Sequence, residues 1–343
     1  MSNPLITDTD QVTQEWLNSV LQINGHLPQG KITAFSKTIS RPFESTTVWI
    51  KAAYDEKALP LPTAFLLKIV GPNSPAGEKE IQFYSRYASA LPRTIIAPCF
   101  DSAYDAAQGA YHLLIADLTA THYSIEREAP PTQSEAETMI DTLADLHSFW
   151  WDKLPSEVEP IDTGLLNDQP FDFAGFVDFM GERLSLERRK IYERIVTALP
   201  TLVRDRIHSG HGQTMVHDDA HPWNFMQPRD HIRDRAVLID WQQWGRSIGM
   251  HDVAKMITLF WYPDHRSKQE QATLRRYCAR LSENGISGYS WDHCWQDYRL
   301  FTLRNMLVPL WAWQWGHWAP HRWVQMEKSL FAFYDLSCED ILA

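Results

Sequence analysis

The residue types most able to do chemistry lie in two short stretches in the second half of the chain. The first is Met215-Val-His-Asp-Asp-Ala-His-Pro-Trp-Asn-Phe-Met226, and the second is Ala236-Val-Leu-Ile-Asp-Trp241. Each joins a short apolar run, typical of a strand, to acidic side chains near the end of that run. If these strands pair, Asn224 lies near Asp240, with Asp219 on the connecting loop. Oxygen ligands of this kind suit Mg²⁺.

The spacing within these stretches resembles that of a known family. His217-x-Asp219-x₄-Asn224, followed by Ile239-Asp240-Trp241, is similar to the catalytic and metal-binding segments of the aminoglycoside-phosphotransferase and choline-kinase family. Members of this family are small-molecule relatives of protein kinases. The continuation Gly249-Met-His-Asp-Val-Ala254 is most similar to bacterial members near the ecdysteroid-kinase-like branch.

The resemblance implies a role for each polar residue of the motif. Asp219 would be the catalytic base that orients and deprotonates an acceptor hydroxyl group, while Asn224 and Asp240 would hold the Mg²⁺ that bridges the triphosphate of ATP. His217 would brace the backbone of the catalytic loop. Asp252 would anchor the same loop by accepting backbone hydrogen bonds, and a plain helix cap is the alternative interpretation.

One residue departs from the family pattern. Asp218 stands between the histidine and the aspartate of the motif, where the family usually has glycine. A second carboxylate at this position either adds negative charge near the metal ions or points away into solvent. The departure leaves Asp219 and Asn224 in place.

The same resemblance implies a phosphate-binding lysine upstream, paired to a glutamate on the helix that follows. Lys68 fits this role because it interrupts an apolar strand, where a lysine needs a counter-charge. Glu80 fits as the partner on the next helix. Lys51 and Glu78 are the competing residues on the same two elements.

Two further nucleotide-binding segments rest on the resemblance alone. A phosphate-binding loop is expected at residues 41–47, with Ser45 and Thr46 among its donors, although this segment contains no glycine. The stretch Leu113-Leu-Ile-Ala-Asp-Leu118 resembles the hinge between the lobes, where backbone groups near Ile115 and Ala116 would meet the adenine edge. An ordinary buried strand is the alternative interpretation of this stretch.

Tryptophan is abundant, with 15 residues concentrated in the second half of the chain. Trp311, Trp315 and Trp318 lie at helical spacing. They are either core residues between packed helices or an apolar wall for a hydroxylated small molecule. Acidic residues outnumber basic residues between His122 and His208, so a cationic substrate stays an alternative.

The elements that must position these residues follow from hydrophobic periodicity and turn signals. We expect a leading helix over residues 10–21, strands over 47–54, 64–70 and 111–116, a helix over 77–90, a capping box at Thr132-Gln-Ser-Glu135, and mainly helices afterwards. A chain of 343 residues exceeds what one core comfortably serves. The predicted fold class is therefore α+β, a bilobal protein-kinase-like fold with a small antiparallel-sheet lobe (1–116) and a larger, mainly helical lobe (117–343).

The amino-acid composition limits the classes of partner that we expect for this protein. The chain has 32 basic and 43 acidic residues, a net charge of −11 that disfavours nucleic acid and anionic membranes. Its four cysteines form neither a zinc pattern nor a disulfide framework. We see no signal peptide and no apolar run of about 18 residues. We therefore expect a cytoplasmic protein, monomer or homodimer, with no nucleic-acid or membrane partner.

The combined expectation is an ATP- and Mg²⁺-dependent phosphotransferase that moves the γ-phosphate to a hydroxyl group of a small molecule, such as an antibiotic, an amino alcohol, a sterol-like compound or another secondary metabolite. One alternative is a metal-dependent phosphohydrolase that uses His217, Asp218, Asp219 and His221 with the His251-Asp252 pair. It gives no role to Lys68, Glu80 or Asn224. The other is a non-catalytic nucleotide-binding pseudokinase.

Overall fold

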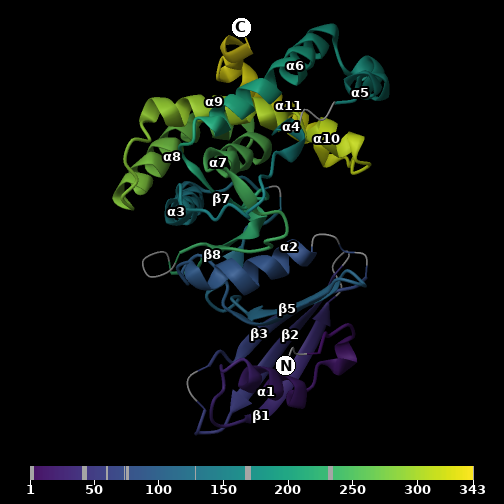
Figure 1. Ribbon diagram of the computed structural model, residues 1–343, viewed down its shortest axis with the longest axis vertical. Helices are drawn as coiled ribbons and strands as arrows, with labels where there is room; N and C mark the ends of the chain where they lie inside the picture. The colour runs from purple at the N-terminus through teal and green to yellow at the C-terminus, as the bar shows by residue number, and fades with distance from the viewer. Residues whose placement is uncertain are drawn as a thin grey trace. The chain divides into compact units, whose positions relative to one another are not determined.

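The computed structural model describes residues 4–40, 45–58, 61–72, 74, 77–127, 129–166, 171–230 and 235–342. The chain divides into two compact units, one of residues 1–123 and 228–243 and the other of residues 124–227 and 244–343. This division differs from a single cut after residue 116, because a later segment of the chain returns to the first unit. In Figure 1 residues 1–123 of the first unit are purple to blue, its residues 228–243 are green, and the second unit runs from teal to yellow.

The first unit is built on a five-stranded antiparallel sheet with strand order β1-β2-β3-β5-β4. Its strands are β1 (Ile32–Ser40), β2 (Ser45–Tyr54), β3 (Ala64–Val70), β4 (Cys99–Asp105) and β5 (Ala110–Ala116). The three predicted strands are present as β2, β3 and β5. β1 and β4 were not predicted, because most of β1 is exposed and β4 contains two aspartates, so neither shows a clear apolar pattern.

The first unit also contains helices, and α1 (Gln14–Ile23) contributes its apolar face to the core against the sheet. The helices are η1 (Thr9–Gln11), α1, α2 (Gly77–Gln82), η2 (Phe83–Tyr87) and η3 (Ala88–Ala90). The predicted leading helix starts later than expected, because Thr13 caps α1 by accepting from the amide of Trp16. Leu17 and Leu21 of α1 join Phe65 and Leu67 in one buried core. Since side chains alternate along a strand, Lys68 lies on the opposite face of the sheet from Leu67.

The second unit is mainly helical, as predicted. Its elements are α3 (Gln133–Trp150), α4 (Thr163–Leu166), α5 (Phe173–Met180), η4 (Gly181–Arg183), α6 (Leu186–His208), η5 (Pro222–Asn224), α7 (Met250–Lys255), η6 (Met256–Phe260), α8 (Pro263–Glu283), α9 (Trp291–Met306), α10 (Val308–Gln314), α11 (His321–Asp335) and η7 (Cys338–Leu342). The predicted capping box is present, with Thr132 and Glu135 each accepting from the other's amide at the start of α3.

The described residues contain five further short strands: β6 (His122–Ser124), β7 (Gln213–Val216), β8 (Phe225–Pro228), β9 (Val237–Leu238) and β10 (Gly245–Ile248), which pairs antiparallel to β7. The β7–β10 pair is buried and lies against α3, whose carbonyl at His147 accepts from the Thr214 hydroxyl group at 2.8 Å. This packing fixes the point at which the loop after β7 begins. The predicted α+β class with an antiparallel sheet is confirmed.

Within the described part of the chain, no helix combines the length and the apolar character that crossing a bilayer requires.

Candidate functional site

A charged cluster in the first unit centres on Lys68. Its ammonium group contacts Glu80 Oε2 at 2.9 Å and Asp240 Oδ1 at 2.8 Å. The predicted pair of Lys68 with Glu80 is therefore present. The competing residues Lys51 and Glu78 are both exposed. The contact with Asp240 joins β3 to the segment that returns from the second half of the chain.

The electrostatics of this cluster keep Lys68 charged. Burial alone lowers the pKa of Lys68, but the charges of Glu80 and Asp240 outweigh it and hold the pKa well above its usual range. Glu80 is only 1% exposed, so it needs compensation within the protein. It also accepts a hydrogen bond from the Tyr111 hydroxyl group at 2.7 Å. Burial and the charge of Glu80 raise the pKa of Tyr111, which stays a donor.

The returning segment is fixed to the first unit by two contacts that the sequence analysis missed. Trp241, fully buried, stacks on Phe83 of η2 with ring centroids 3.7 Å apart and planes within 6°. Gln242 donates to the Tyr111 hydroxyl group at 2.9 Å. The sequence offered one signal for such contacts, because the polar atom of a buried tyrosine or tryptophan usually has a hydrogen-bond partner. These contacts place Asp240 beside Lys68.

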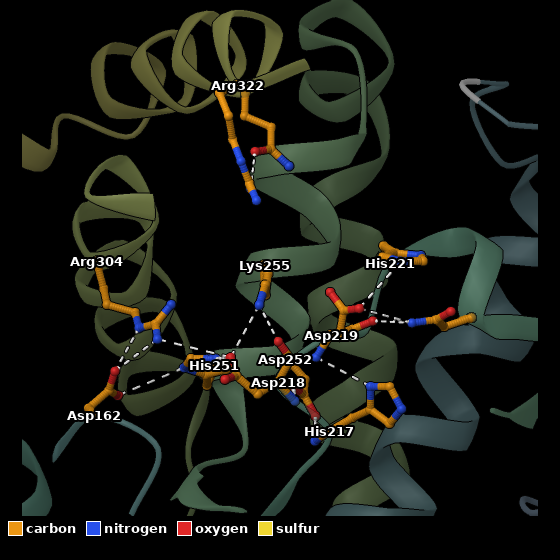
Figure 2. A network of polar contacts seen from close by, with 12 residues as sticks. Asp162, His217, Asp218, Asp219, His221, His251, Asp252, Lys255, Arg304 and Arg322 are labelled. Atoms are coloured by element: carbon orange, nitrogen blue, oxygen red, sulfur yellow. Dashed lines mark hydrogen bonds and ion pairs between the residues drawn. The ribbon is translucent and has the colours of Figure 1, made fainter. Parts of the chain in front are cut away.

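A second cluster lies on the loop that follows β7 in the second unit, shown in Figure 2. His217 is fully buried, and its Nδ1 accepts from the amide of Asp219 at 3.3 Å. Asp252 of α7 accepts from the amides of His217 at 2.7 Å and Asp218 at 2.9 Å. The predicted bracing by His217 and anchoring by Asp252 are both present in the geometry.

Asp252 is not a helix cap. The N-cap position of α7 is Gly249, and the Asp252 carboxylate hydrogen-bonds to loop amides and to His147 Nε2 at 3.3 Å. Burial by itself raises the pKa of this carboxyl group, but the hydrogen bond and charge of His147 outweigh it and hold the pKa below its ordinary value. The carboxylate therefore stays ionised and fastens the loop to α7.

Asp218 neither faces solvent nor adds uncompensated negative charge. Its Oδ1 lies 2.7 Å from His251 Nε2 and 3.2 Å from Lys255 Nζ, and Arg304 lies 4.0 Å away. Lys255 also donates to the Asp218 backbone carbonyl. Burial opposes ionisation, but the charges of Lys255 and His251 prevail and place the pKa of Asp218 well below its usual range. Figure 2 shows these cations gathered around Asp218.

The backbone explains why a glycine is usual at this position. Asp218 has φ of 58°, a left-handed conformation that glycine adopts freely and aspartate tolerates better than most residues. The ionic contacts with His251 and Lys255 compensate for this conformation. Asp240, in the first unit, shares the left-handed geometry with φ of 66°.

Asp219 and Asn224 lie together on the loop after β7, Asp219 partly exposed and Asn224 buried. Asn224 Nδ2 donates to the Asp219 carbonyl at 2.9 Å and to its carboxylate at 3.3 Å, which directs the amide nitrogen toward Asp219. His221 Nε2 lies 3.5 Å from Asp219 Oδ2. The Asp219 side chain is 27% exposed, so its carboxylate is within reach of a substrate hydroxyl group.

The two residues that the sequence predicts as Mg²⁺ ligands lie in different units, Asn224 in the second and Asp240 in the first. The Asn224 amide oxygen and the Asp240 carboxylate are hard oxygen donors. In the part of the chain that the structure describes, no group of three or more His, Cys, Asp and Glu side chains could hold a metal ion.

The other residues predicted to bind the nucleotide lie in the sheet of the first unit, Ser45 and Thr46 in β2 and Ile115 and Ala116 in β5. Ser45 and Thr46 are the first residues of β2 and pair with Val70 and Ile69, whereas residues 41–44 of the expected loop lie outside the described residues. Ala116 donates its amide to Pro98 at 2.9 Å within the sheet, so this amide is not available to an adenine edge. Ile115 pairs with β3 and β4 as an ordinary buried strand residue.

The tryptophans do not form one helical stripe. Helix α10 ends at Gln314, so Trp318 lies beyond it and the prediction of a shared helical face is wrong for this residue. Trp311 and Trp315 are stacked, with ring centroids 6.3 Å apart, and Trp315 is 61% exposed. Trp318 packs instead on Phe179 of α5, at 5.0 Å between centroids.

A match to a protein-family model shows the family of the chain. Residues 38–291 match the model described as the phosphotransferase enzyme family. The chain belongs to this family. The matched residues contain both clusters, the Lys68 group and the catalytic loop, and end before α10 and α11. No curated protein matches the chain.

Solved structures share the fold of this phosphotransferase at low identity. An ethanolamine kinase of Plasmodium vivax matches with a TM-score of 0.56 and 11% identity over 88% of this chain and 81% of that chain. A microcompartment-associated aminopropanol kinase has a TM-score of 0.56 and 13% identity over 89% and 90% of the two chains. The GDP complex of aminoglycoside 2'-phosphotransferase-IIIa has a TM-score of 0.52 and 12% identity over 94% and 100%.

Family membership makes the chain a small-molecule kinase, and the sequence resemblance to aminoglycoside phosphotransferases is confirmed. The finer resemblance to the ecdysteroid-kinase-like branch stays a prediction. The phosphohydrolase and pseudokinase alternatives find no support in the matched family or in the kinases that share the fold.

Proposed function

We propose that this phosphotransferase moves the γ-phosphate of ATP to a hydroxyl group of a small-molecule acceptor. The observation that carries the proposal is the Asp219–Asn224 pair, held on a loop whose backbone is fastened by Asp252. A partly exposed carboxylate on a rigid loop is the arrangement that a general base for an alcohol requires.

Each residue then has one task. Asp219 orients the acceptor hydroxyl group and receives its proton while the bond from that oxygen to the γ-phosphorus forms and the bond from phosphorus to the leaving ADP oxygen breaks. Lys68, kept charged by Glu80, binds the α- and β-phosphates, and Ser45 and Thr46 stay proposed donors to the phosphates. Asn224 and Asp240 would hold Mg²⁺, which when bound neutralises phosphate charge. His217 and Asp252 position the loop.

The kinases that share the fold support the acceptor class in outline. Their names give ethanolamine, aminopropanol and aminoglycosides, all of which carry a hydroxyl group. ATP is proposed as the donor, and GTP is the competing nucleotide because one of these structures is a GDP complex. We expect the reaction in the cytoplasm, by a monomer or homodimer, with no nucleic-acid or membrane partner.

The direct test is a screen of hydroxylated metabolites and antibiotics that measures ADP release in the presence of Mg²⁺ and ATP. A compound that raises ADP release identifies the acceptor class. With that acceptor, Asp219→Ala and Asp219→Asn should lower kcat by about 10²–10⁴-fold, the usual contribution of a general base. Nucleotide binding, measured by calorimetry, should be nearly unchanged.

Asp264→Asn is the matched control, since the Asp264 side chain is 81% exposed on α8. It should behave as the wild type. If the Asp219 variants retained wild-type turnover, the base would be misassigned. If no compound raised ADP release although nucleotide bound, the non-catalytic alternative would gain support.

A further inference from the structure

Arg322 is a partly buried arginine whose charge has no carboxylate partner. It lies in the first turn of α11, and its Nη1 donates to Gln325 Oε1 at 2.8 Å. Its Nε is buried and has no hydrogen-bond partner. Among the residues that the structure describes, no acidic side chain forms an ion pair with it within 4.0 Å. Within the described part of the chain, the guanidinium group therefore has one neutral side-chain acceptor for its five donors.

Other arginines of the second unit differ from Arg322 because they have a carboxylate partner. Arg188, Arg276 and Arg280 each hydrogen-bond to a carboxylate, and that bond raises the pKa of each one. For Arg322 burial dominates and lowers the pKa. The helix dipole gives no compensation, because a cation near a helix N-terminus is unfavourable. Partial burial of a charge that has no ion-pair partner does not stabilise the fold.

The position of Arg322 relates it to the catalytic loop. The charge of Asp219 acts on Arg322, although the two are not joined by a hydrogen bond or an ion pair. In Figure 2 the Arg322 side chain extends from α11 toward the loop that carries Asp219. The neighbouring cations Lys255 and Arg304 are engaged by Asp218 and Asp162. Arg322, by contrast, forms no ion pair with the residues that the structure describes, so an incoming ligand can engage its charge without breaking one.

The surroundings of Asp219 favour an acceptor with an apolar body. His221 packs against Trp223 and Phe260, with ring centroids 4.9 Å and 5.3 Å away. Trp323, the residue after Arg322, packs against Trp318 at 5.2 Å. Arg322 also lies beyond residues 38–291, which match the family model.

We propose that Arg322 binds an oxyanion of the acceptor, so that the acceptor is a hydroxylated molecule carrying a carboxylate or a related anionic group. This inference rests on the proposed function and adds the charge of the substrate. The planar guanidinium group binds a carboxylate or phosphate through two parallel hydrogen bonds, and its charge repels a polycationic acceptor. The hydroxyl group of the same molecule would then lie toward Asp219.

The first arm of the test measures binding without phosphoryl transfer. Benzoate, phenylphosphonate and benzenesulfonate are titrated into the full chain by calorimetry, beside neutral benzamide and cationic benzylamine. The wild type should prefer the anions, and the ranking of the three anions separates carboxylate from phosphoryl and sulfonyl recognition. Arg322→Met should weaken anion binding about tenfold or more, while Arg322→Lys should restore part of it.

The matched control is Arg188→Met. Arg188 contacts the same helix α11, but its guanidinium group is already held by Glu327 at 2.6 Å and 2.9 Å. This variant should bind the anions as the wild type does. Thermal unfolding of all variants shows whether a loss of binding is instead a loss of folding, and the partial rescue by lysine provides a second check.

The second arm uses phosphoryl transfer to matched acceptors, para-hydroxymethylbenzoate, its amide and the corresponding benzylamine. Arg322→Met should raise KM for the hydroxy acid about tenfold, with little change for the amide and an unchanged KM for ATP. An equal fall in kcat for charged and neutral acceptors would mean that Arg322 acts on the phosphoryl group, and would overturn the inference.

The outcomes separate this inference from the proposed function. Anion binding that depends on Arg322, without transfer to any alcohol, would support the anion site and count against the kinase. Transfer to neutral or cationic alcohols that is indifferent to Arg322→Met would support the kinase and overturn the anion site. Wild-type protein with no preference for anions over benzamide would also overturn it.

Discussion

Lys68, the residue proposed to bind phosphate, is held by ionic contacts on two sides. Its ammonium group is held between Glu80 and Asp240, with atoms at 2.9 Å and 2.8 Å, and both charges keep it protonated. Lys68→Ala should lower kcat/KM for ATP on the order of a hundredfold, because a preorganised cation at the phosphates is lost. Steady-state kinetics with the acceptor found in the screen measures this change.

The neighbouring strand offers the control for Lys68. Lys51 on β2 is exposed and is not part of the Glu80 cluster, so Lys51→Ala should retain wild-type kinetics. Loss of activity in the Lys51 variant with retention in the Lys68 variant would show that the phosphate-binding strand position is wrong. Glu80→Gln should give an intermediate effect, since Lys68 keeps its contact with Asp240.

At the scale of elements, the loop after β7 depends on one left-handed residue. Asp218, with φ of 58°, is held by His251 and Lys255. Asp218→Gly removes these contacts but keeps the backbone unstrained, whereas Asp218→Ala removes them and adds about 1–2 kcal/mol of strain. Both variants should be less stable than the wild type at pH 7, and the alanine variant the less stable of the two.

Denaturation with urea, monitored by circular dichroism, gives the three free energies of unfolding. The order wild type, glycine, alanine is the expected one. An alanine variant as stable as the glycine variant would mean that the loop relaxes out of the left-handed conformation. A glycine variant more stable than the wild type would mean that the ionic contacts of Asp218 do not compensate for its backbone.

The anchor of the same loop gives a pH dependence. The folded-state pKa of Asp252 lies below its unfolded value of about 3.9, so its contribution is fully present above that value and is lost as the pH falls through the folded pKa. The difference in free energy of unfolding between the wild type and Asp252→Asn should therefore be largest near pH 7 and shrink below about pH 4. Urea denaturation across this range measures it. A constant difference would contradict the assignment.

The sequence predicted several contacts between polar residues better than it predicted the elements that hold them. Lys68, Glu80, His217 and Asp252 were predictable, because each combines a motif with a local pattern that demands a partner. The partners of Asp218 were not, since Lys255 and Arg304 come from two helices whose packing no local pattern encodes. Strands β1 and β4 were missed because exposed or acidic strands carry little apolar periodicity.

At the scale of the whole molecule, the first unit is not a continuous piece of the chain. Residues 228–243 return to it and bring Asp240 and Trp241. A single cut in the sequence could not show this, because the anchoring contact joins Phe83 and Trp241, which lie in the two separate segments of this unit. The fold of this unit therefore depends on residues that follow the catalytic loop.

This dependence makes Trp241 a critical residue for stability although it is remote from the acceptor chemistry. It is fully buried and stacked on Phe83, so Trp241→Ala should cost about 3–5 kcal/mol of unfolding free energy and disturb the position of Asp240. Trp315→Ala is the matched control, because Trp315 is 61% exposed and its loss should cost less than about 0.5 kcal/mol. Guanidinium denaturation of both variants measures the contrast. Equal losses would mean that burial of Trp241 does not hold the returning segment, whereas a selective loss in Trp241→Ala, with weaker nucleotide binding, would tie the stability of the first unit to the placement of the proposed metal ligand.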